Sequence, residues 1–137
     1  MQRPIDQHTA LIFTMVLVSA AEGEMTDGEL EMIGRQVRYL PVFKGFDQDL
    51  LTRIGRQCAE LLRDEDGLAL AVDMIAEALP GPLRETAYAL ACEVAAADGA
   101  LAIEELNLLG MLRQELSVDR LVAVAIERAT YARHAVL

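Results

Sequence analysis

The segment VSAAEGEMTDGELEMIG, residues 18–34, returns as VAAADGALAIEELNLLG, residues 94–110, with no gap and at an offset of 76 residues. Each copy has a run of small residues, an acid followed by glycine, five further residues, a Glu-Leu pair, and a glycine four positions after that leucine. A repeat constrains the architecture before any single residue does. The chain is therefore expected to hold two equivalent helix–turn–helix units, which would be related by a pseudo-two-fold axis if they pack together.

Helical signals continue outside the repeat. Thr26-Asp-Gly-Glu29 is a capping box at a helix start, and Pro41 ends that helix because the residue before a proline avoids the α region. No stretch alternates polar and apolar residues for long enough to be a strand. We expect helices over residues 4–22, 26–40, 47–63, 68–79, 83–97, 103–116 and from a cap at Ser117 to the early 130s. This is an all-α fold of about seven helices in one domain, residues 1–137.

Composition narrows the class of protein. Apolar residues make up 53% of the chain, which is enough for a sizeable core, and the net charge of −10 argues against nucleic-acid binding. Cys58 and Cys92 form no CxxC motif, so we expect a reduced thiol pair in a cytoplasmic protein. Residues 9–21 carry no charge but are too few for a bilayer span, which needs about 20. They indicate a buried helix, with peripheral membrane association at most.

Carboxylates gather in the two repeated turns. Glu22 and Glu29 of the first copy recur as Asp98 and Glu105 in the second. Glu22 and Asp98 fall at expected helix C-termini, where the helix dipole disfavours an anion by roughly 0.3–1 kcal/mol. Two such cases at equivalent positions ask for a compensating partner, such as a cation, an arginine or a helix N-terminus. Carboxylates beside the free carbonyls of a helix end suit Ca²⁺ or Mg²⁺.

A simpler interpretation of these acids stays open, namely helix capping and solubility. Glu29 is explained by the capping box, whereas Glu105 is not, because Ala102 at the position of Thr26 has no hydroxyl. An EF-hand is excluded, since the twelfth position counted from Asp98 is a leucine where a bidentate glutamate is required. The pattern therefore predicts either a shared cation site or four structural acids.

The pattern Ala-Ala-Glu-Gly at 20–23 with Glu29-Leu30, repeated as Ala-Ala-Asp-Gly at 96–99 with Glu105-Leu106, resembles the TerB-like family of tellurite-resistance proteins. The resemblance covers the whole chain in length and helix order. It implies an all-helical module of the response to metal or oxyanion stress, including tellurite, in which the acids of both turns cluster. It also implies a divalent cation held by Glu22, Glu29, Asp98 and Glu105. The first copy departs from the family pattern, because Glu22 replaces an aspartate.

No pairing of a nucleophile with a base stands out elsewhere in the sequence. His8 and His134 lie near the two termini and are expected to be exposed, and no Gly-rich phosphate loop occurs. We therefore expect a non-enzymatic protein, with hydrolysis as a distant alternative. Gly34 and Gly110, inside helices, predict close helix–helix contacts.

Five basic residues form a predicted cluster, which is either a face for an unidentified protein partner or anionic membrane surface, or a set of salt bridges with neighbouring acids. They are Arg35, Arg38, Lys44, Arg53 and Arg56.

Overall fold

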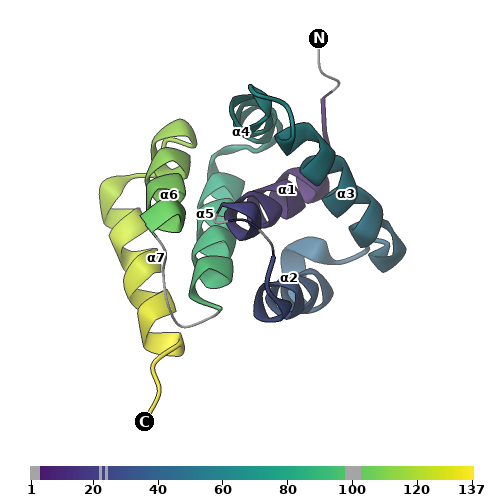
Figure 1. Ribbon diagram of the computed structural model, residues 1–137. Coiled ribbons are helices and arrows are strands. Elements are labelled where there is room, and N and C mark those ends of the chain that lie inside the picture. Colours follow the sequence, from purple (N-terminus) through teal and green to yellow (C-terminus); the bar gives the residue numbers. More distant parts are fainter. Residues whose placement is uncertain (1–3, 22, 24, 98–102) are drawn as a thin grey trace.

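The computed structural model describes residues 4–21, 23, 25–97 and 103–137, and all regular structure in these ranges is helical (Figure 1). The prediction of an all-α fold with seven helices is confirmed. The α-helices are α1 (Gln7–Ala20), α2 (Asp27–Tyr39), α3 (Leu51–Leu62), α4 (Gly67–Ala78), α5 (Gly81–Ala96), α6 (Ile103–Glu115) and α7 (Arg120–Arg133). Two short 3-10 helices, η1 (Pro41–Phe43) and η2 (Gln48–Leu50), join α2 to α3.

The core is built around α1. Every residue from 10 to 19 is buried, which confirms that the uncharged N-terminal run is a buried helix. Helices α3 and α4 pack on one side of α1 and α5 on the other, and α6 and α7 lie beyond α5 (Figure 1). Because α1 contacts five other helices, it is apolar all round and has no polar face. None of the described helices is both long and apolar enough to cross a membrane.

Local capping sets the helix boundaries. The Asp6 carboxylate accepts a hydrogen bond from the Thr9 N–H at 2.8 Å, so α1 begins at Gln7 and not at Pro4. The predicted capping box of α2 is present. The Thr26 hydroxyl accepts from the Glu29 N–H at 3.1 Å, and Glu29 Oε1 accepts from the Thr26 N–H at 2.9 Å.

One predicted cap was wrong. Ser117 does not cap α7 but takes a left-handed conformation, with φ 55°, in the turn after α6. The cap is Asp119, whose carboxylate accepts hydrogen bonds from the N–H groups of Leu121 and Val122. Serine and aspartate are both good N-caps, so α7 begins after the one whose side chain reaches the first free N–H groups of the helix.

The predicted close contacts at Gly34 and Gly110 were also wrong. A Cβ built on either residue meets no described atom within 4 Å, and Gly110 is exposed. The close approach in this fold is at Gly67, where a Cβ would collide with the Leu61 carbonyl as α4 turns back on α3.

The two repeat copies agree in burial. Glu29 and Glu105 are each 1% exposed, whereas the leucines that follow them, Leu30 and Leu106, are 54% and 50% exposed. The repeated Glu-Leu pair therefore inverts the usual rule, with the acid inside and the leucine outside.

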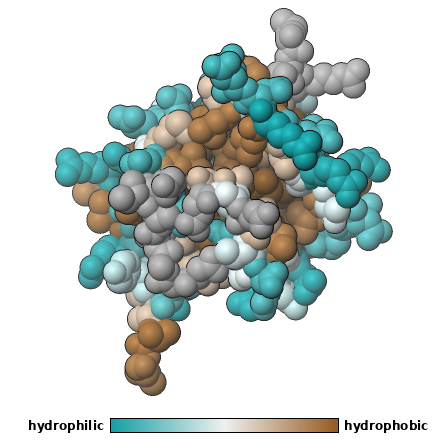
Figure 2. All heavy atoms as spheres, in the orientation of Figure 1, coloured by the Kyte–Doolittle hydropathy of each residue, from teal (hydrophilic) through white to brown (hydrophobic). Residues whose placement is uncertain are grey.

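Hydrophilic residues cover most of the periphery seen in Figure 2, and the C-terminal residues project from the body as an apolar end.

Candidate functional site

The four acids predicted to bind a cation divide into two pairs. Glu22 and Asp98 lie outside the described residues, whereas Glu29 and Glu105 lie inside them. Within the described ranges, no group of three or more His, Cys, Asp or Glu side chains is placed to hold a metal ion. The four-acid cluster therefore stays a prediction, and the structure bears on two of its members.

Glu29 occupies the third position of α2, and its two carboxylate oxygens differ. Oε1 accepts the capping-box hydrogen bond from the Thr26 N–H at 2.9 Å. Oε2 is buried and accepts no hydrogen bond from the described residues. A buried polar atom without a partner costs roughly 1–3 kcal/mol, and more when it is charged. The capping box therefore explains one oxygen of Glu29 and leaves the other as a candidate ligand atom.

Glu105 occupies the equivalent third position of α6 and is buried to the same extent as Glu29. Both carboxylates thus lie in the first turn of a helix, where unpaired N–H groups and the helix dipole favour an anion. This field offsets part of the cost of burying each charge. The sequence pattern singled out both residues as candidate ligands but did not predict their burial, because acids in first turns are usually exposed.

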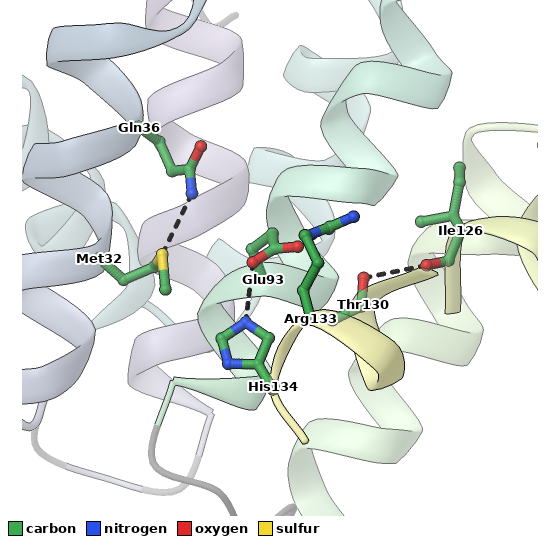
Figure 3. A network of polar contacts seen from close by, with 7 residues as sticks. All are labelled: Met32, Gln36, Glu93, Ile126, Thr130, Arg133 and His134. Atoms are coloured by element: carbon green, nitrogen blue, oxygen red, sulfur yellow. Dashed lines mark hydrogen bonds and ion pairs between the residues drawn. The ribbon is translucent and has the colours of Figure 1, made fainter. Parts of the chain in front are cut away.

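A polar site that the sequence did not predict joins α5 to the end of α7. Glu93 is buried, and its Oε2 lies 2.8 Å from His134 Nε2 while its Oε1 contacts the Arg133 guanidinium (Figure 3). His134 was expected to be exposed, but the exposed fraction of its side chain is 25%. The available signal was a single acid within residues 87–97, a run that carries no other charge.

Next to this site, Tyr88 and Cys92 extend the polar side of α5. The Tyr88 hydroxyl donates to Glu127 Oε2 at 2.5 Å. Burial, and then this hydrogen bond, raise the pKa of Tyr88 well above its usual value. Burial also raises the pKa of Cys92 to about 12, so its thiol stays protonated at neutral pH.

His8 was also expected to be exposed, and this was wrong. Its ring stacks on Phe43 with the centroids 5.5 Å apart and meets the edge of Phe46 at 5.2 Å. Its Nε2 donates to the Val42 carbonyl at 2.8 Å. His8 therefore ties the start of α1 to η1.

The basic cluster is largely free of the predicted salt bridges. Arg35 pairs with Glu31 at 3.4 Å, and both side chains are well exposed, so the pair contributes little stability. Arg38 lies over the ring of Tyr39. The remaining members, Lys44, Arg53 and Arg56, are exposed and form no ion pair within the part of the chain that the structure describes.

Comparison of this chain with protein-family models, with curated proteins and with solved structures finds no match in any of the three.

Proposed function

We propose that this protein is a non-enzymatic, TerB-like module of a metal or oxyanion stress response that binds a divalent cation between its two repeat turns. The observation that supports the proposal is the burial of Glu29 and Glu105 at equivalent positions, with Glu29 Oε2 left without a hydrogen bond inside the described residues. Two free, buried cysteines suit a reducing compartment, so we propose a cytoplasmic location.

A hard divalent cation would offset the cost of burying these carboxylates. Ca²⁺ and Mg²⁺ prefer carboxylate and carbonyl oxygens, and Ca²⁺ takes six to eight of them. Glu29 and Glu105 would supply two ligands, and Glu22 and Asp98 are the proposed others. The ion would neutralise the buried charges and would favour acids at the C-terminal ends of α1 and α5, where the helix dipole disfavours them.

The competing explanation is that all four acids serve capping and solubility. Capping uses Glu29 Oε1 and the helix dipole, so it predicts no dependence of stability on cations. Cation binding predicts a gain in the free energy of unfolding that grows with concentration and reaches about 2.7 kcal/mol at one hundred times Kd.

The test is thermal unfolding with Ca²⁺, Mg²⁺, Mn²⁺ or Zn²⁺ at millimolar concentration, measured against an EDTA baseline. We expect at least one cation to raise Tm in the wild type and to leave Tm unchanged in an Asp98→Asn/Glu105→Gln double variant. An Asp64→Asn/Glu65→Gln variant removes two exposed acids elsewhere and should keep the wild-type shift. No shift with any of the four cations, or equal shifts in all three proteins, would eliminate the cation site.

A second candidate is a protein-interaction module with structural acids and no metal. It is favoured by Lys44, Arg53 and Arg56, three exposed cations on a chain of net charge −10 that form no ion pair with described residues. Such a face fits a partner with an acidic surface. A partner that co-purifies with the wild type in EDTA, and with an Arg128→Glu control, should be lost in Arg53→Glu/Arg56→Glu. Dependence of that partner on cation, or its retention by the double variant, would contradict this candidate.

A further inference from the structure

Helices α5, α6 and α7 line a cavity of about 580 Å³ that is open to solvent on one side. This volume lies within the range of roughly 300–1,000 Å³ that is typical of small-molecule sites. None of the described acids of the predicted cation cluster lines the cavity. Its function is therefore separate from the one proposed above.

The wall formed by α5 and α6 is apolar. Ala95 and Ala96 of α5 line it together with Leu106 and Leu109 of α6. Gly110 leaves the backbone of α6 bare at this wall, and an added Cβ would meet no described atom within 4 Å. The glycine that does not serve helix packing thus borders the cavity, where its missing side chain leaves room.

Most of the polar side chains that line the cavity already form hydrogen bonds within the protein. Glu127 accepts the hydrogen bond from Tyr88, and His134 is held by Glu93. The Thr130 hydroxyl donates to the Ile126 carbonyl (Figure 3). These groups shape the site, but their strongest interactions are made inside the protein.

Arg113 is different. It lines the cavity, and its guanidinium forms no hydrogen bond or ion pair with the described residues. A guanidinium beside an apolar wall matches a carboxylate geometrically, since it can donate two parallel N–H bonds to the two oxygens. Arg113 also lies in the last turn of α6, where the helix dipole favours a cation. Removing its charge would therefore lower stability even without a ligand, so the test has to measure ligand binding.

We propose that the cavity binds a small amphipathic carboxylate, with its apolar body against α5 and α6 and its carboxylate on Arg113. The protein's net charge of −10 opposes the approach of an anion, so contact with the apolar wall has to supply much of the affinity. A carboxylate without an apolar body should therefore not bind, and an apolar body with a cationic head should bind worse.

Titration calorimetry in EDTA, with each probe below its micelle-forming concentration, tests both parts of the proposal. We expect heat of binding with decanoate, none with acetate, and at least about tenfold weaker binding of decyltrimethylammonium. Arg113→Gln should weaken decanoate binding about tenfold or more, because a hydrogen-bonded charge pair is lost, and Arg113→Lys should recover part of it.

The repeat offers a matched pair of variants for the apolar wall. Gly110→Met places a side chain into the cavity, whereas Gly34→Met places the same side chain at the equivalent position of α2, away from the cavity. Gly110→Met should abolish decanoate binding and Gly34→Met should leave it unchanged. The proposal is overturned if decanoate does not bind the wild type, if the two methionine variants bind it equally, or if the cationic probe binds as tightly as decanoate.

Discussion

Helices α1 and α5 occupy equivalent places in the repeat, but they bury different chemistry. At the offset of 76 residues, α1 buries an apolar residue at three positions where α5 buries an ionisable one. The pairs are Ile12 with Tyr88, Val16 with Cys92, and Leu17 with Glu93. Helices α3 and α4 cover α1, whereas α7 covers α5.

The same helical arrangement therefore supports an apolar interior in one copy and polar contacts between helices in the other. In the first copy the covered part of α1 is almost entirely apolar. In the second copy Tyr88 bonds to Glu127 of α7, and Glu93 holds Arg133 and His134 at the C-terminal end of α7. These bonds add to the apolar packing of Val122, Ala123 and Ile126 of α7 against the core, and a cavity remains between α5, α6 and α7.

Substitutions at the equivalent residues Leu17 and Glu93 are expected to differ most in their effect on stability. Leu17→Glu should lower the free energy of unfolding by about 4 kcal/mol or more, because it buries a charge without a partner. Glu93→Leu should change it by less than about 1.5 kcal/mol, since an apolar residue can replace a buried acid and the half-exposed Arg133 can turn to water.

Urea unfolding of both variants, followed by circular dichroism, measures these changes. Similar losses in the two variants would show that the Glu93 contacts are as essential to the fold as the apolar core around α1.

The apolar half of this comparison was predictable from sequence. The uncharged run in residues 9–21 predicts a buried helix, and Thr26 with Glu29 predicts a capped helix start. Both signals are local, since propensity and capping depend on neighbours along the chain.

The polar half was not predictable in the same way. The fate of Glu93 depends on Arg133 and His134, about forty residues away, and nothing local indicates that they meet. The prediction of close helix contacts at Gly34 and Gly110 was wrong for a related reason. A glycine inside a helix indicates either a close contact or an open space, and only the positions of the other helices distinguish the two. Of the predicted cation ligands, Glu29 and Glu105 are buried at the starts of α2 and α6, and Glu22 and Asp98 lie outside the described residues.

The two buried thiols, Cys58 beside α1 and Cys92 on α5, are expected to lower stability at alkaline pH. Burial raises the pKa of each from 9.0 to about 12. Above pH 9 the unfolded chain loses thiol protons that the folded chain keeps, so stability falls as pH rises from about 9 towards 12 and is unaffected by these groups below that range. The slope is at most about 1.4 kcal/mol per pH unit for each thiol.

Urea midpoints at a series of pH values test this prediction. Cys58→Ala and Cys92→Ala should each reduce the slope above pH 9 by the contribution of one group, whatever their stability at neutral pH. A slope unchanged in both variants would mean that ionisation elsewhere, such as at Tyr88, controls the alkaline transition.

The smallest effect concerns the paired glycines. Gly34→Ala and Gly110→Ala should each raise the free energy of unfolding by about 0.5–1 kcal/mol, because alanine reduces the backbone freedom of the unfolded chain and neither Cβ meets a described atom. Equal gains in thermal or urea unfolding are expected even though only Gly110 lines the cavity. A loss at Gly34 alone would mean that another surface packs on α2 in solution. A loss at Gly110 alone would mean that the wall of α6 closes more tightly than the cavity volume implies, and would count against a ligand site there.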